Sequence, residues 1–190
     1  MVRNRNTANI RLSQAGPPTT MGFMVTIRGH RRSDLPQVWT LATMPHIGAT
    51  ADPSAPLPLP AAAEPPTAFP VLADPDALPG GDLLVGEIDG HIVAMGGLWD
   101  HGQGRAEIVF VRVHPATRRR GIGRRLMTAL EERALALGYD EVVLNTATNQ
   151  PEAVAFYRAL GYKGVRTETR PEWHWTLIHF EKPLGASDSR

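Results

Sequence analysis

A strand-like segment is followed directly by a helix-like one in the stretch VRVHPATRRRGIGRRL, residues 111–126. Gly121 and Gly123 stand in the turn between them, and apolar residues then recur every three or four positions over 122–137, as in an amphipathic helix. The first amide N–H groups of such a helix have no partner within it and lie at the positive end of its dipole. Glycine also lets a ligand approach that backbone closely. The stretch therefore predicts an anion site, suited to a phosphate.

Six arginines lie between residues 112 and 125 with no acidic residue among them, which adds favourable charge for an anion. The stretch is not a P-loop, because no Lys-Ser or Lys-Thr follows a glycine, and it lacks the third glycine of the GxGxxG dinucleotide pattern. Taken alone, two glycines are more often plain turn residues beside a solvated face; the segments that follow favour the anion site. A nucleic-acid site would need exposed aromatics or a recognition helix, and neither is evident. We expect no nucleic-acid partner, and oligonucleotide binding through residues 118–125 is the weaker alternative.

The segments around this stretch predict a mixed α/β (α+β) fold, a central and mostly antiparallel sheet flanked by helices. Asp89-Gly90 is a typical two-residue hairpin turn between two apolar runs, and Asp100 to Gly104 is a polar turn. The expected strands span 24–28, 83–88, 91–99, 106–114, 141–146, 162–166 and 173–181, and the expected helices span 34–43, 122–137 and 152–160.

Residues 51–80 differ in character from the rest of the chain, since they hold 9 of its 17 prolines and 8 alanines. Proline cannot donate to a helix or a sheet ladder, so this segment is predicted to be a long, semi-rigid loop. A structureless connection of this length is either a surface excursion or a functional wall or lid over a binding site.

Composition excludes several classes of protein. The 190 residues are 42% hydrophobic and carry a net charge of +1, which is typical of a globular chain and not of a general nucleic-acid binder. No apolar run is long enough to cross a bilayer, so no membrane partner is expected. Cysteine is absent, which excludes disulfides, thiolate metal sites and a cysteine nucleophile and favours a reducing, cytoplasmic location. No histidine pair has metal-ligand spacing, so no metal is expected.

The pattern Arg118-x-x-Gly121-x-Gly123, preceded by His114-Pro115, resembles the pyrophosphate-binding motif of the GNAT superfamily of acyl-CoA-dependent N-acetyltransferases. Residues 144–146 and 150–162 resemble the family's final helix and its surroundings, with the spacing of alanine, tyrosine and glycine before an aromatic residue. The resemblance is specific over 106–184. It implies a GNAT fold and an N-acetyltransferase domain over 21–184, within which the 51–80 loop is an insertion. The resemblance does not extend to residues 1–20, whose arginine-rich, acid-free composition predicts a disordered leader, and residues 185–190 are expected to be a tail.

The resemblance implies that acetyl-CoA is the acyl donor. It assigns the pyrophosphate to the turn, the pantetheine amides to the preceding strand by strand-like pairing, and a further contact to the residue that stands where many members have asparagine. The implied coenzyme-binding residues are Val111, Arg112, Val113, Arg118, Arg119, Arg120, Gly121, Ile122, Gly123, Arg124 and either Gln150 or Asn149.

Two residues are implied in catalysis. Tyr157 matches the family's usual general acid, and a phenol can protonate a departing thiolate. Glu107 lies 11 residues before Arg118, where some protein-acetylating members keep a catalytic glutamate, and an unpaired carboxylate inside a β-branched strand is costly. The alternative interpretations are structural: Tyr157 only packs on the sheet, and Glu107 lies at the exposed start of a strand.

The resemblance predicts transfer of an acetyl group to a primary amine of a small molecule or protein, by direct attack in a ternary complex, since no cysteine can carry the acyl group. A CoA-binding regulatory module without turnover is the alternative. The family often pairs through its last strands, so a homodimer is a possible assembly. Trp173 and Trp175 are expected on one face of the last strand, where the indoles either pack in the core or border an acceptor pocket. His174 and His179 are expected on the same strand as structural residues.

Overall fold

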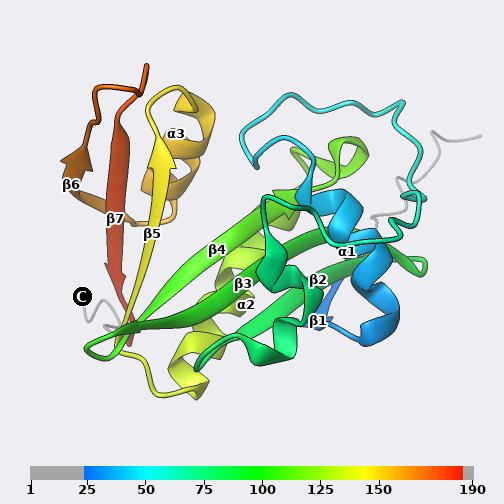
Figure 1. Cartoon of the computed structure of the whole chain (residues 1–190), viewed down its shortest axis with the longest axis horizontal. Coiled ribbons are helices and arrows are strands. Elements are labelled where there is room, and N and C mark those ends of the chain that lie inside the picture. The colour runs from blue at the N-terminus through cyan, green and yellow to red at the C-terminus, as the bar shows by residue number, and fades with distance from the viewer. Residues whose placement is uncertain (1–23, 186–190) are drawn as a thin grey trace, which may run out of the picture.

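The computed structural model describes residues 24–185, so the predicted leader over 1–20 and residues 186–190 of the predicted tail lie outside the described residues. A seven-stranded sheet in the order β1-β2-β3-β4-β5-β7-β6 forms the centre of the molecule (Figure 1). Only the β4–β5 pair is parallel, as predicted for a mostly antiparallel sheet. The strands are β1 (Thr26–Gly29), β2 (Asp82–Ile88), β3 (His91–Gly102), β4 (Arg105–Val113), β5 (Glu141–Ala147), β6 (Lys163–Glu168) and β7 (Leu177–Pro183).

Turn chemistry places the hairpins. Asp89 and Gly90 both have positive φ, 49° and 80°, which is the backbone of the predicted two-residue turn between β2 and β3. The expected polar turn over 100–104 is wrong in extent, because β3 continues through Gly102 and only Gln103 and Gly104, at φ 57° and 73°, make the turn. A two-residue turn of this kind keeps the strands paired up to its edge.

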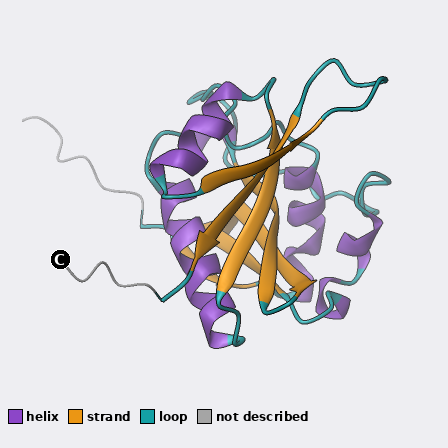
Figure 2. Cartoon of the chain, turned by 90° about the vertical axis from the view of Figure 1, so that its left-hand side faces the viewer, coloured by secondary structure: helices purple, strands orange, loops and turns teal. Residues whose placement is uncertain are grey.

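Helices cover both faces of the sheet (Figure 2). On one face α2 (Ile122–Ala136) packs against β1 to β5, and α3 (Pro151–Ala159) packs against β5, sharing one apolar core. On the other face α1 (Leu35–Ala42) packs against β3 and β4 over a second core that includes Leu41, Leu83 and Met95. No helix among residues 24–185 is long and apolar enough to span a membrane.

The strands β4 and β5 diverge after a short contact. They pair only where residues 105–107 meet residues 141–143, whereas β5 goes on pairing with β7 as far as Ala147 (Figure 1). A bulge in β4 accompanies the divergence: one residue of β3 between Met95 and Gly97 faces two of β4, and Phe110 has φ 57°. Residues 108–113 thus have no strand partner on the β5 side within the described chain.

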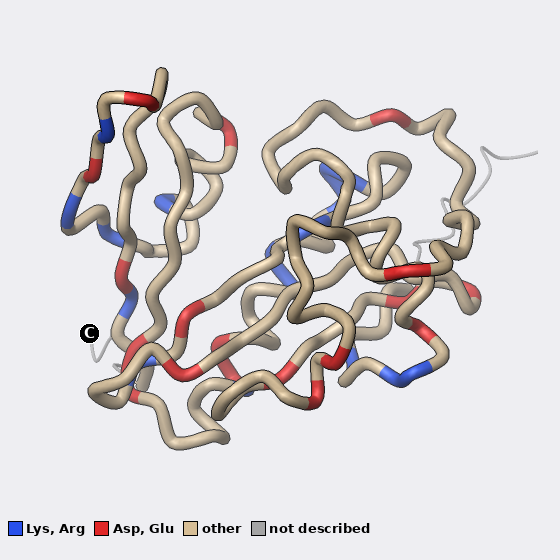
Figure 3. The backbone as a smooth tube through the Cα atoms, viewed as in Figure 1, with Lys and Arg blue, Asp and Glu red and all other residues tan. Residues whose placement is uncertain are grey.

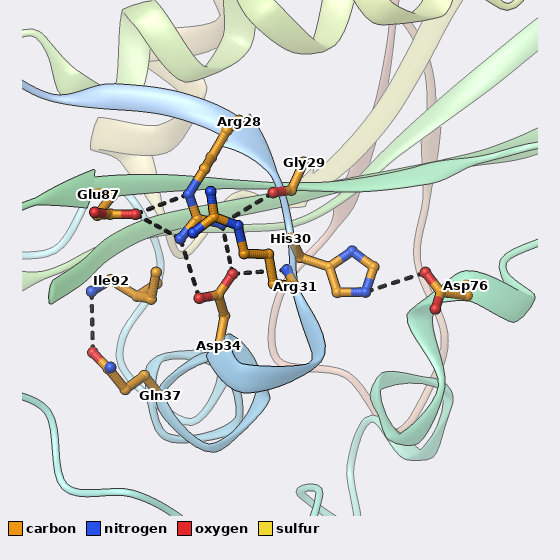
Figure 4. A network of polar contacts seen from close by, with 9 residues as sticks. All are labelled: Arg28, Gly29, His30, Arg31, Asp34, Gln37, Asp76, Glu87 and Ile92. Carbon is orange, nitrogen blue, oxygen red and sulfur yellow. Dashed lines mark hydrogen bonds and ion pairs between the residues drawn. The ribbon is translucent and has the colours of Figure 1, made fainter. Parts of the chain in front are cut away.

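The Pro/Ala-rich segment over 51–80 forms two short 3₁₀ turns, η2 (Pro70–Ala73) and η3 (Pro75–Ala77), and is otherwise irregular. It is tied to α1, because Trp39 Nε1 donates to the Leu72 carbonyl at 2.7 Å and the Leu72 side chain is fully buried. A polar network at the adjacent end of β1 joins it to the rest: His30 Nε2 lies 3.3 Å from Asp76 Oδ1 (Figure 4). The segment is therefore an anchored wall rather than a loose excursion.

The expected strand over 173–181 is wrong in its first half. β7 begins at Leu177, and Trp173, His174 and Trp175 lie in the loop after β6, while His179 lies on β7 as expected. The two indoles stack on each other with centroids 4.2 Å apart, and Arg170 lies over Trp173. Their alternation predicted a strand, but stacking of i and i+2 indoles stabilises the loop instead.

Candidate active site

The turn before α2 adopts the geometry that an anion site requires. Gly121 is the N-cap residue of the helix and has φ 78°, a conformation that favours glycine; no side chain among residues 24–185 accepts a hydrogen bond from the first amides of the helix. Gly121, Gly123, Arg119 and Arg124 line a cavity of about 220 Å³ together with Ile47 and Phe156. The first turn of α2 contains no acidic residue, and basic positions gather where β4 passes into α2 (Figure 3).

Gly123 is needed for space rather than for backbone conformation. A Cβ atom at this position would lie 2.7 Å from Ile47 Cδ1 and 3.3 Å from the ring of Phe156. The loop after α1 therefore lies against the start of α2 at Ile47, and it lies against α3 at Gly48, where an added Cβ would be 2.6 Å from the Ala153 amide nitrogen. Ile47 lines the cavity at the start of α2. It also lines a second cavity, in the gap between β4 and β5, which is described below, so the two cavities adjoin.

Arg118, predicted among the coenzyme-binding residues, has its guanidinium turned inward. It donates to the carbonyls of Val113 at 2.9 Å, Thr50 at 2.7 Å and Pro45 at 3.0 Å, and only 6% of the residue is exposed. Burial lowers its pKa, with a further contribution from the charge of Arg112. Its side chain therefore fixes the loop over 45–50, and the favourable charge expected of the arginine cluster falls to the exposed Arg119 and Arg124 and to the other exposed arginines.

A second cavity, of about 300 Å³, occupies the gap between β4 and β5. Tyr157 reaches it from α3 and Glu107 from β4, so the two predicted catalytic residues line the same space. Val111 and Gln150 line it too, whereas Val113 lines the cavity at the start of α2 and Asn149 lines neither. Of the two residues that could stand for the family's asparagine, Gln150 is the one brought to the gap.

Tyr157 is buried among other aromatic rings. Its ring lies 5.4 Å from that of Phe156 and 5.9 Å from that of Tyr162, and only 6% of the residue is exposed. Burial raises the pKa of the phenol to about 12, although the nearby charge of Arg112 lowers it somewhat. The hydroxyl has no hydrogen-bond partner within residues 24–185. It is thus a neutral donor available to a group in the cavity.

The carboxylate of Glu107 is held by neutral donors. Trp99 Nε1 donates to Oε2 at 2.8 Å and Asn145 Nδ2 donates to Oε1 at 2.9 Å, while His101 Nδ1 lies 3.4 Å from Oε2. A carboxylate has about four lone-pair positions, so these contacts orient Glu107 and leave it able to accept from an ammonium group. It also lines a wider cavity, of about 570 Å³, on the open face of β5, β7 and β6.

Several residues of the gap were missed by sequence reasoning. Phe69, Trp99 and Phe110 form an aromatic wall, with centroids 5.4 Å and 5.8 Å apart in edge-to-face pairs. Phe69 comes from the Pro/Ala-rich segment, so the proposal of a functional wall fits its position. His46 also lines the gap; burial and the charges of the nearby arginines lower its pKa, and its Nδ1 accepts from the Gly48 amide at 3.1 Å. Nothing local in the sequence marks these four residues, because tertiary packing brings them together.

The chain matches the model of the acetyltransferase (GNAT) family over residues 50–162, which contain the start of α2, Glu107 and Tyr157. It belongs to this family. As a GNAT acetyltransferase it is an acyltransferase, and the family's acyl donor is acetyl-CoA. The predicted family and the predicted fold class are confirmed.

Solved structures share the GNAT fold across most of the described chain. The ribosomal-protein-S18-alanine N-acetyltransferase from Escherichia coli is 17% identical with a TM-score of 0.65, covering 88% of this chain and 99% of that one. The spermidine/spermine N-acetyltransferase SpeG from Vibrio cholerae is 16% identical with a TM-score of 0.61, covering 86% and 95%. The yncA protein from Salmonella typhimurium, solved with its cofactor acetyl-CoA, is 20% identical with a TM-score of 0.61, covering 87% and 96%. At these identities the likeness establishes the fold.

The residues of this GNAT chain fit a coenzyme A diphosphate at the start of α2. The first amides of the helix bond to no side chain of the described residues, and at Gly123 any larger side chain would fill the space beside Ile47 and Phe156. Exposed arginines rim the cavity, and no group of three or more metal-ligating side chains gathers anywhere in the described residues. The diphosphate charge would therefore be met by amide N–H groups and guanidinium groups.

Proposed function

We propose that this protein transfers an acetyl group from acetyl-CoA to a primary amine by direct attack within a ternary complex. The observation that carries the proposal is the shared cavity of Glu107 and Tyr157 in the gap between β4 and β5. This cavity adjoins the one at the start of α2, so donor and acceptor can meet between the two residues. No cysteine is present in the chain to hold the acyl group, which favours direct transfer.

On the donor side, the backbone does most of the binding. The amides of residues 119–124 would receive the diphosphate, and the unpaired edge of β4 at Val111 and Val113 would pair with the pantetheine amides as an added strand does. Gln150 lies directly before α3. Its side-chain oxygen accepts a hydrogen bond from Thr146 Oγ1 at 3.1 Å, and its side-chain NH₂ group can still donate.

When bound, acetyl-CoA supplies a thioester whose carbonyl carbon is open to attack. Glu107 holds the acceptor's ammonium and takes its first proton, directly or through water, so that the neutral amine can attack. The N–C bond forms and the C–S bond breaks, while Tyr157 gives its proton to the departing sulfur. A backbone N–H on the free edge of β4 stabilises the charge that develops on the carbonyl oxygen.

The protons balance as follows. The ammonium loses two protons. One passes through Glu107 to solvent. The other passes through solvent to the Tyr157 oxygen and replaces the proton that Tyr157 has given to the sulfur. The products are the N-acetylated amine, CoA as a thiol and one proton released to solvent.

The test is release of free CoA thiol from acetyl-CoA with a panel of amines. We expect turnover with wild type and a loss of roughly 100-fold or more in kcat for Tyr157→Phe. Tyr139→Phe is the matched control, since the Tyr139 hydroxyl only donates to the Gly80 carbonyl at 2.7 Å, away from the gap. The control is expected to keep wild-type kcat.

Tight binding of acetyl-CoA with no turnover on any amine would overturn the proposal in favour of the regulatory module. Equal kcat for wild type and Tyr157→Phe would remove Tyr157 from the chemistry. The acceptor's class, small molecule or protein, is decided by which members of the panel turn over. The homodimer stays a prediction.

A further inference from the structure

Three chemically different groups line the cavity in the gap between β4 and β5, where the proposed function places the acceptor; this part of the cavity is called its acceptor side. Glu107 offers a carboxylate, the aromatic wall of Phe69, Trp99 and Phe110 offers apolar ring surface, and Arg112 offers a guanidinium. A simple alkylamine would use only the first two. The third group needs a partner of its own, and its surroundings indicate which kind.

Arg112 is a cation without an acidic partner among the described residues. Its Nε donates to the Met44 carbonyl at 3.1 Å and its Nη1 to the Val111 carbonyl at 3.0 Å, which leaves Nη2 without a hydrogen-bond partner within residues 24–185. Burial lowers its pKa, as expected for a charge removed from water with no counter-charge, although the proximity of Tyr157 acts in the opposite direction. A partly buried guanidinium of this kind is best satisfied by a carboxylate.

The diphosphate of the coenzyme is not the missing partner of Arg112. The cavity at the start of α2 is lined by Arg118, Arg119 and Arg124 but not by Arg112. The guanidinium instead lies 6.0 Å from the centroid of Phe69, in the wall of the acceptor side. The anion that Arg112 would bind is therefore expected to enter with the acceptor.

The carboxylate and the aromatic wall are fixed to each other. Trp99 donates to Glu107 at 2.8 Å, packs edge-to-face on Phe110 at 5.8 Å, and Phe110 packs in the same way on Phe69 at 5.4 Å. Phe69 is held in turn by its segment, whose Leu72 is buried against α1. A substituent on an ammonium bound at Glu107 would therefore lie beside the rings.

We propose that the acceptor is a free α-amino acid with an aromatic or large aliphatic side chain. Its ammonium binds Glu107, its side chain packs on the Phe69–Trp99–Phe110 wall, and its carboxylate pairs with the free edge of the Arg112 guanidinium. This assignment rests on the proposed function and deepens it. A polypeptide N-terminus has an amide in place of the α-carboxylate and so leaves Arg112 without its partner.

The test compares phenylalanine, phenylalaninamide and phenethylamine as acceptors, with CoA thiol release as the readout. The three share ring and amine and differ in the group that would meet Arg112. We expect kcat/KM for phenylalanine to exceed that of the other two by roughly 10- to 100-fold, because a charge-assisted pair is lost with each. Alanine, which has the carboxylate but no ring, is expected to be poor through loss of contact with the wall.

Two variants locate the recognition. Arg112→Gln is expected to remove the preference for phenylalanine over phenylalaninamide, and Phe69→Ala to lower kcat/KM for phenylalanine by about tenfold while leaving alanine unchanged. Val71→Ala is the matched control for the segment, because Val71 packs on the same core without lining the gap, and it is expected to keep the wild-type preference.

The outcomes separate this inference from the proposed function. Turnover of phenylalaninamide, phenethylamine, a polyamine or a peptide N-terminus at or above the rate for phenylalanine would overturn the amino-acid assignment and leave the acetyltransferase activity standing. Absence of turnover with every amine would overturn both. The wild-type series alone decides the question if Arg112→Gln fails to fold.

Discussion

Tyr157 is the residue whose environment most restricts the mechanism. Burial raises the pKa of its phenol to about 12, so the hydroxyl stays protonated throughout the neutral and mildly alkaline range. We therefore expect kcat to rise with pH as the bound amine loses its proton and then to stay level to about pH 10, measured by CoA thiol release. A decline centred below pH 10 that disappears in Tyr157→Phe would show that the phenol ionises there and contradict this assignment.

Glu107 owes its place to neutral donors on both sides. Glu107→Gln keeps a carbonyl oxygen for one of them and loses the charge that attracts an ammonium. We expect kcat/KM for the amine to fall roughly 10- to 100-fold with the KM for acetyl-CoA unchanged, measured by varying each substrate in turn. Glu132→Gln, on the exposed side of α2, is the control and should match wild type. A Glu107→Gln enzyme with wild-type amine kinetics would reduce Glu107 to a structural residue.

At the scale of elements, two substitutions at Gly121, directly before α2, distinguish the effect of backbone strain on coenzyme binding from the effect of charge. Any side chain at Gly121 is strained at φ 78°, but apart from its chain neighbours no atom of the described residues lies within 4 Å of an added Cβ. Gly121→Ala and Gly121→Glu therefore share the strain, of about 1 kcal/mol, and differ in the charge placed at the anion site. We expect CoA affinity, measured by calorimetry, to fall at least tenfold further in the glutamate variant than in the alanine variant. Equal affinities would place the diphosphate elsewhere.

Local patterns predicted the elements well where short-range physics decides them. The Asp89-Gly90 turn, the apolar stripe of α2 and the strand-to-helix turn at Gly121 each depend on residues close in sequence, and each is where it was expected. The left-handed bulge at Phe110 and the divergence of β4 from β5 depend on packing between distant segments, and nothing around Phe110 indicates them. The aromatic wall was missed for the same reason.

For the whole molecule, the site depends on two cores on opposite faces of one sheet. The face under α2 and α3 carries Tyr157, and the face under α1 and the Pro/Ala-rich segment carries the aromatic wall. In the gap between β4 and β5, residues from both faces line one cavity. Anything that holds the α1 face to the sheet therefore also holds one wall of the acceptor site in place.

Asp34, the residue directly before α1, provides such a connection. Arg28 on β1 donates to the Asp34 carboxylate at 2.7 Å and to the Glu87 carboxylate on β2 at 2.8 Å (Figure 4). Burial would raise the pKa of Asp34, but the hydrogen bonds from Arg28 and the Arg31 amide outweigh it and lower the pKa below its ordinary value. A group with a lowered pKa stabilises the folded state above its unfolded pKa and loses that contribution as the pH falls through the folded pKa.

We therefore expect Asp34→Asn to lower the free energy of unfolding by about 1–3 kcal/mol at pH 7, measured by urea denaturation. The difference from wild type should shrink as the pH is lowered below about 4, because the Asp34 carboxylate is then protonated in the unfolded chain and, at still lower pH, in the folded chain too. Asp89→Asn, in the exposed hairpin turn where asparagine also tolerates positive φ, should stay within about 0.5 kcal/mol at every pH. A difference for Asp34→Asn that persists unchanged at pH 3 would mean that packing around the carboxyl, and not its charge, holds β1, α1 and β2 together.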